Sequence, residues 1–198
     1  MPHRRARLVV SEPVPPAVSN TRLAMLIVIC AECMLFAGLI GMYLVFRLAA
    51  QTWPPANLPR LPIGITAINT VLLFTSLVPL TRALHAVRRA SALGIARRVW
   101  VTAGLGLTFL VIQGSEWLRL VQHGLTLGSG PYGSAFYVLI GCHAVHVLSA
   151  VLWLAAVAML AARGSFTAAR HAGLEMCTMY WYFVCGLWGV LFPLVYLY

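Results

Sequence analysis

Lysine and aspartate are both absent from the 198 residues of this chain, and only four glutamates are present. Charged residues make up 9% of the sequence and hydrophobic residues 61%, whereas soluble domains carry about 25% charged and 45–50% apolar residues. Together with a mean hydropathy of +0.88, this composition excludes a soluble domain and predicts an integral membrane protein. The basic residues are all arginines. They lie between apolar segments and form no stripe, so they favour membrane anchoring over nucleic-acid binding.

Five apolar segments are long enough to cross about 30 Å of hydrocarbon as helices. Barrel strands would alternate apolar and polar residues, and only helices satisfy every backbone group within one segment in lipid. We therefore predict an all-α membrane bundle, in which a short N-terminal arm, residues 1–22, precedes a five-helix domain, residues 23–198. The predicted spans are Leu23–Phe46, Ile63–Thr81, Val99–Val121, Ser134–Ala162 and Leu174–Tyr198.

The arginines also predict the orientation of the bundle. Eleven lie in the N-terminal arm and in the connections that follow the second and fourth spans, whereas three lie on the opposite side. Because positive residues concentrate in cytoplasmic loops, we expect a cytoplasmic N-terminus and a periplasmic C-terminus in a bacterial inner membrane. Residues 1–22 lack the apolar core of a signal peptide, so the first span should be an uncleaved anchor.

Three of the four glutamates lie within or at the rim of the predicted spans, namely Glu32, Glu116 and Glu175. An ionisable side chain inside a membrane costs about 2.5–3.5 kcal/mol on insertion scales, so such residues usually face a protein interior. At 1.5 Å per residue, Glu32 lies roughly 13 Å from the cytoplasmic end of its span. Burial favours the uncharged form of a carboxyl group, and we therefore expect an exchangeable proton on Glu32.

Two histidines of the fourth span, His143 and His146, are one turn apart and share a helix face. They lie about 13 and 18 Å below the outer end of the span. Glu116 is at a similar depth in the third span, so we expect it to pair with one of them. Two histidines provide too few ligands for a metal site, and the paired Glu-x-x-His motifs of a di-iron bundle are missing. We predict no haem or metal in this chain and a polar network between helices.

Several short motifs follow one another in an order that resembles subunit III of the haem-copper terminal oxidases, in its five-helix bacterial form. They are Trp53-Pro54-Pro55, Asn69-Thr70, Gln113-x-x-Glu116-Trp117, Tyr132-Gly133-Ser134, Gly141-x-His143-x-x-His146, Tyr180-Trp181 and Trp188. The resemblance covers about residues 22–198. The seven-helix mitochondrial form has two further N-terminal helices.

This resemblance implies an accessory, non-catalytic subunit that packs against subunit I, in a complex with subunit II and other respiratory subunits. Haem and copper would be held by those partners, where oxygen reduction and proton pumping take place. The family also implies bound phospholipid, sustained proton uptake and protection from inactivation during turnover. Its polar positions map onto Glu32, Glu116, His143, His146 and Glu175.

The last span departs from the family pattern. Tyr182 and Cys185 stand where the family commonly has a histidine and an aspartate. Two alternatives remain open from the residues alone: an accessory subunit of a nitric oxide reductase, and a stand-alone proton or ion channel. The residues also leave open whether the complex oxidises cytochrome c or quinol, and which haem type it holds.

Overall fold

The chain is helical apart from short connections in the computed structural model, which describes residues 19–55, 58–89, 94–167 and 170–198. Most of the predicted N-terminal arm lies outside these residues. Five segments are long and apolar enough to span a membrane, because α2 and α3 form one span and α6 continues into η1. This confirms the all-α prediction with five spans. The elements are α1 (Asn20–Ala49), α2 (Ile63–Thr75), α3 (Leu77–Arg88), α4 (Ile95–Gln122), α5 (Pro131–Ala162), α6 (Ala172–Phe192) and the π-helical turn η1 (Pro193–Leu197).

The second span is broken at Ser76 and continues further than its sequence predicted. Pro79 has no N–H to donate, and its ring would collide with the carbonyl group of Thr75, four residues earlier. The regular helix therefore breaks one residue after Thr75, where the backbone N–H of Ser76 is shared between the carbonyl oxygens of Leu73 at 3.1 Å and Leu72 at 3.2 Å. Beyond the predicted end at Thr81, α3 runs on to Arg88, because its last turns are amphipathic and not uniformly apolar.

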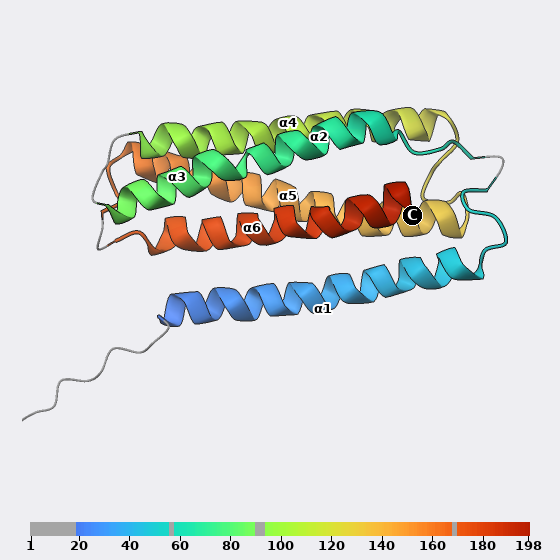
Figure 1. Ribbon diagram of the computed structural model, residues 1–198, viewed down its shortest axis with the longest axis horizontal. Coiled ribbons are helices and arrows are strands. Elements are labelled where there is room, and N and C mark those ends of the chain that lie inside the picture. The colour runs from blue at the N-terminus through green and yellow to red at the C-terminus, as the bar shows by residue number, and fades with distance from the viewer. Residues whose placement is uncertain (1–18, 56–57, 90–93, 168–169) are drawn as a thin grey trace, which may run out of the picture.

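Helices α2 to α6 pack together as a bundle, and α1 lies along one side of it, against α5 and α6 (Figure 1). Only 11% of the apolar stretch of α1 is buried within the chain, against 33–39% in the other four spans. Its buried positions, Met25, Phe36 and Tyr43, are separated by multiples of about one helical turn. Helix α1 therefore contacts the bundle through one narrow stripe.

The core of the bundle is rich in aromatic side chains. Phe109 of α4, Phe136 of α5 and Trp181 and Trp188 of α6 are all buried. Helix α4 approaches the others closely at Gly106, where any side chain would collide with the Trp181 ring. Small residues that allow such approaches are typical of helix packing in membranes.

Candidate functional site

Glu32 of α1 and His146 of α5 form the polar contact between these helices. Glu32 Oε2 lies 2.9 Å from His146 Nε2, and the two side chains are 26% and 13% exposed. The other ring nitrogen of His146, Nδ1, lies 2.7 Å from the carbonyl oxygen of Cys142, one turn earlier in α5. A carbonyl oxygen can only accept a hydrogen bond, so Nδ1 carries a proton and donates it.

The proton on Nδ1 limits where a proton can be placed between His146 Nε2 and the Glu32 carboxyl group. An unprotonated Nε2 and an ionised carboxylate would both be acceptors, and would repel each other at this distance. The contact therefore needs one shared proton. Either protonated Glu32 donates to a neutral imidazole, or a protonated His146 donates to a carboxylate. The pair is neutral overall in both forms, which suits a site within a membrane span. Glu32 and His146 thus share one proton in their hydrogen bond.

The predicted pairing of Glu116 with His143 or His146 is wrong. Glu116 Oε1 instead accepts a hydrogen bond at 2.9 Å from Arg119, one turn along α4. The carboxyl side chain is 6% exposed and the arginine side chain 67% exposed. Depth along the membrane predicts which residues are level with one another, but it does not predict toward which neighbour each helix face turns.

His143 has a different role from His146, which lies one turn further along α5. Its ring is 1% exposed and stacks on Trp188, with centroids 5.2 Å apart and an interplanar angle of 21°. The edge of Phe36 from α1 lies against it at 6.4 Å. Among the described residues neither ring nitrogen has a hydrogen-bond partner. His143 therefore packs as an aromatic ring, whereas His146 hydrogen-bonds between helices.

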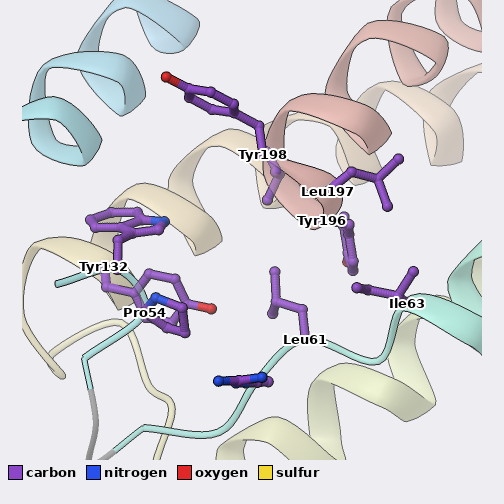
Figure 2. Close-up of a pocket in the computed structure, with 10 residues that line it drawn as sticks. Pro54, Leu61, Ile63, Tyr132, Tyr196, Leu197 and Tyr198 are labelled. Atoms are coloured by element: carbon purple, nitrogen blue, oxygen red, sulfur yellow. The ribbon is translucent and has the colours of Figure 1, made fainter.

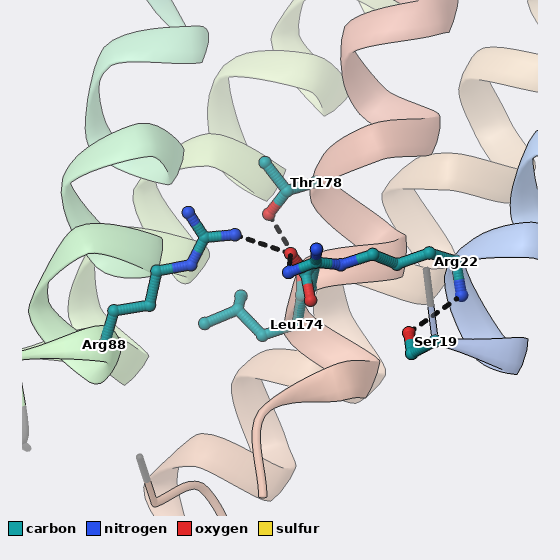
Figure 3. A network of polar contacts seen from close by, with 6 residues as sticks. Ser19, Arg22, Arg88, Leu174 and Thr178 are labelled. Carbon is teal, nitrogen blue, oxygen red and sulfur yellow. Dashed lines mark hydrogen bonds and ion pairs between the residues drawn. The ribbon is translucent and has the colours of Figure 1, made fainter. Parts of the chain in front are cut away.

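Glu175, in the first turn of α6, joins three helices at the end of the bundle where α1 begins. Its Oε1 accepts from Arg22 of α1 at 2.7 Å and from Arg88 of α3 at 2.5 Å. Figure 3 shows the two arginines approaching from opposite sides. The carboxyl side chain is only 12% exposed, and both arginines are exposed by more than 40%. The predicted polar position is thus an ion-pair cluster.

Asn69, Gln113 and Trp117 of the family motifs all lie in the bundle. Asn69 Nδ2 donates to the carbonyl oxygen of Phe109 in α4 at 3.0 Å, and Gln113 Nε2 donates to the hydroxyl oxygen of Tyr196 in η1 at 2.8 Å. The Trp117 ring makes an edge contact with Tyr137 of α5, with ring centroids 6.3 Å apart. These contacts fix α4 relative to α2 and to the end of the chain, which is a structural role.

The two buried tryptophans of α6 hydrogen-bond back to the second span. Trp181 Nε1 donates to Ser76 Oγ at 3.0 Å, next to the break between α2 and α3. Trp188 Nε1 donates to Thr70 Oγ1 at 2.9 Å. A buried indole N–H needs such an acceptor. Both motif tryptophans therefore combine packing with a hydrogen bond that aligns α6 with α2.

The two departures from the family pattern are one turn apart on α6 but differ in burial. Tyr182 is 40% exposed, and its hydroxyl group bonds to that of Thr81 in α3. Cys185 is fully buried, with a free thiol. At these positions the chain therefore has one hydroxyl contact and one buried thiol, and no imidazole or carboxylate.

Trp53, Pro54 and Tyr132 line a hollow of about 260 Å³ at the opposite end of the bundle (Figure 2). The Trp53 ring makes edge contacts with Tyr43 of α1 at 5.6 Å and with Tyr132 of α5 at 4.8 Å. Gly133 is required beside it, because a side chain there would collide with the preceding connection. The connection between α1 and α2 is thus held to the start of α5 by aromatic contacts.

Two arginines that hold α1 in place were not predicted from the sequence. Besides Arg22, Arg47 Nη2 donates to the carbonyl oxygen of Tyr198 at 3.1 Å, and its guanidinium lies 5.9 Å from the Trp53 ring. The arginines indicated orientation, but they were not matched to acceptors. The depths of Glu32 and His146, measured from opposite ends, together equal about one membrane thickness and so place the two residues level with each other, but depth alone does not select this pair.

Within the described residues no three His, Cys, Asp or Glu side chains gather closely enough to hold a metal ion. His146 pairs with Glu32, and His143 lies between the rings of Phe36 and Trp188. The Glu32–His146 pair therefore joins α1 to α5. The described residues assemble no set of ligands for a redox centre.

The sequence matches known proteins along most of its length. Residues 14–198 match the family described as cytochrome c oxidase subunit III. The chain is 34% identical over 168 residues to cytochrome c oxidase subunit 3 of Synechocystis, covering 84% of this chain and 71% of that protein. It is 33% identical over 168 residues to the Corynebacterium diphtheriae protein of the same name, covering 83% and 82%. It is 29% identical over 188 residues to cytochrome c oxidase subunit 3 of Balaenoptera musculus, and this match covers 92% of this chain and 71% of that longer protein.

These matches favour the oxidase over the nitric oxide reductase and channel alternatives, and they extend through all the described helices. The chain therefore belongs to the cytochrome c oxidase subunit III family, as a non-catalytic, multi-pass membrane subunit of that oxidase.

Proposed function

We propose that this subunit packs directly against subunit I in the bacterial inner membrane and sustains proton uptake by the oxidase through the Glu32–His146 pair. The observation that carries the proposal is the geometry of that pair, which requires one shared proton at a 2.9 Å contact inside a membrane span. Carboxyl and imidazole side chains are not redox groups, so the pair supplies no electrons. Its role is to support the proton supply of the catalytic subunit.

The proposed orientation places the N-terminus and the connections after Arg88 and Arg163 in the cytoplasm. It is supported by the unequal distribution of arginines and by the odd number of spans. A reporter fused after Arg89 should be active only when it is a cytoplasmic reporter. Activity of a periplasmic reporter at that point would overturn the orientation.

Phospholipid bound beside α1 is part of the same proposal. Large apolar side chains of α1 remain outside the bundle, among them Ile27 at 62% and Met34 at 78% exposed. Acyl chains match such side chains as well as a protein surface does. Delipidation of the purified complex should therefore loosen α1 before the other helices.

The proton role can be separated from the mechanical role of the contact by comparing Glu32→Gln with Glu32→Ala. The amide of glutamine can still donate to His146 Nε2 but carries no exchangeable acidic proton, whereas alanine removes the contact entirely. Both variants should assemble and keep the initial rate of oxygen consumption. During sustained turnover Glu32→Ala should lose activity fastest, and Glu32→Gln should lose it faster than the wild type.

Glu116→Gln is the matched control, because it makes the same chemical change at a carboxyl group that has no histidine partner. It should lose activity at the wild-type rate. If Glu32→Gln stopped initial oxygen consumption in a fully assembled complex, Glu32 would be catalytic and the accessory role would be wrong. If Glu32→Gln were as durable as the wild type, the pair would be only a mechanical contact.

A further inference from the structure

A positively charged hollow lies where α3 ends and α4 begins. It has a volume of about 410 Å³ and is lined by Arg82, His85, Ala86, Arg89 and Arg98. The first four lie on one face of α3, since they are three, four and seven residues apart. Arg98, in the first turn of α4, completes the hollow and donates a long hydrogen bond, 3.4 Å, to the carbonyl oxygen of Arg82.

None of the described glutamates neutralises this hollow. Glu32 contacts His146, Glu116 contacts Arg119, and Glu175 accepts from Arg22 and Arg88. Arg88 lies on the other face of α3, toward α6, so α3 ends with one arginine that is paired and two that line the hollow. Three guanidinium groups gathered without a carboxylate repel one another. One guanidinium group can donate two parallel hydrogen bonds to two oxygens of the same phosphate. A phosphate is therefore the ligand that fits this hollow.

Exposed apolar side chains lie one turn away from two of the lining arginines, one on each helix. Val78 lies one turn before Arg82 on the same ridge of α3, and Val101 lies one turn after Arg98 on α4; each is 46% exposed. Helix α3 runs toward this end of the molecule and α4 away from it (Figure 1), so both valines lie deeper along the bundle than the arginines. A charged group at the end of a span with an apolar track beneath it matches a phospholipid better than a soluble anion.

We propose that this hollow binds the phosphate of an anionic phospholipid, whose acyl chains run along Val78 and Val101. The inference rests on the membrane placement of the proposed function, but it needs neither the orientation nor the proton role. The site is separate from the Glu32–His146 pair, which lies between α1 and α5. Basic pockets between spanning helices are known to take anionic head groups.

The test uses the assembled oxidase complex in nanodiscs that contain either phosphatidylglycerol or phosphatidylcholine, with native mass spectrometry to count retained lipids. Wild-type complex should retain one more phosphatidylglycerol than the double variant Arg82→Gln/Arg98→Gln, and phosphatidylcholine should not replace it. Each arginine removed should weaken phosphatidylglycerol binding about fivefold. Arg97→Gln is the matched control, because Arg97 is an exposed neighbour that does not line the hollow, and it should bind like the wild type.

Three results would overturn the inference. Equal lipid retention in the double variant and in Arg97→Gln would show that the hollow does not select the lipid. Displacement of the lipid by millimolar inorganic phosphate would identify a small soluble anion as the ligand. Loss of a neighbouring subunit with unchanged lipid count would identify a protein carboxylate as the occupant.

Two further measurements keep the test decisive. If the double variant does not assemble, Arg89→Gln at the exposed end of α3 replaces it. Val101→Ser should lower phosphatidylglycerol retention while it leaves the arginines in place, and unchanged retention there would contradict the acyl track. Oxygen consumption of the complex is recorded in parallel. A variant that loses the lipid but keeps durable turnover contradicts nothing in the proposed function, and the two proposals fail independently.

Discussion

Helix α1 and the bundle of α2 to α6 are held in place in different ways. Side-chain hydrogen bonds and ion pairs tie α1 to its neighbours at both ends and near its middle, through Arg22, Glu32 and Arg47. The bundle instead encloses a continuous set of buried aromatic and aliphatic side chains. A single polar side chain of α1 therefore contributes more to holding that helix in place than any one of its apolar contacts. In the bundle, a single buried apolar side chain contributes more than a polar one.

The two parts of the molecule differ because the solvent around these helices is lipid and not water. Lipid tails are as apolar as leucine side chains, so burial of apolar surface does not drive helices together inside a membrane. A helix that touches its neighbours along one stripe, as α1 does, gains little from close packing and depends on polar contacts. Helices that are surrounded on several sides gain from dense packing and dispersion.

The largest effect should follow from opening the bundle core. Trp188→Ala removes a fully buried ring, its stacking on His143 and its hydrogen bond to Thr70. Replacing a buried tryptophan by alanine costs about 3–5 kcal/mol, so the subunit should be lost from the complex on purification. The measurement is the ratio of this subunit to its partners by mass spectrometry. Trp100→Ala is the control, because that ring is 46% exposed, and a similar loss there would contradict the comparison.

A smaller and more local effect should follow from Glu175→Ala. Hydrogen bonds to charged groups contribute about 1.5–3 kcal/mol, but Arg22 and Arg88 are largely exposed, and exposed pairs contribute about 1 kcal/mol or less. The subunit should stay in the complex, while amide hydrogen exchange in the first turns of α1 becomes about fivefold faster. Exchange in α4 is the internal control. Equal acceleration in both helices would mean that Glu175 stabilises the bundle and not the attachment of α1.

Arg47→Gln should have a weaker effect at the other end of α1. It removes the hydrogen bond to the Tyr198 carbonyl group and the contacts with the Trp53 and Tyr198 rings. An exposed cation–aromatic contact contributes about 0.5–1 kcal/mol. Exchange should rise only in the last turn of α1, near Ala49. A rise that reached Glu32 would show that the two polar contacts are coupled.

Sequence predicted the parts of this molecule that depend on local composition and on position along a span. Five helices, the polar residues within them and the level of Glu32 follow from hydropathy and helix rise. Rotation of each helix about its axis could not be predicted, because it depends on how all the helices pack. That is why Glu116 was expected beside a histidine, and why His146 was not matched to Glu32. Pro79 did give a local signal for the break at Ser76.

The smallest effect should follow from Glu116→Gln, and it tests the corrected pairing directly. A carboxylate that joined α4 to α5 through a buried histidine would cost about 3–5 kcal/mol when its partner was lost. Among the described residues Glu116 bonds to Arg119 within α4, and although the carboxyl group is 6% exposed the arginine is 67% exposed. A pair within one helix whose arginine faces solvent contributes about 0.3–0.5 kcal/mol. Thermal stability of the complex should therefore be almost unchanged, and far less affected than by Glu32→Ala. A loss as large as that of Trp188→Ala would mean that Glu116 does join two helices and that its partner is not Arg119.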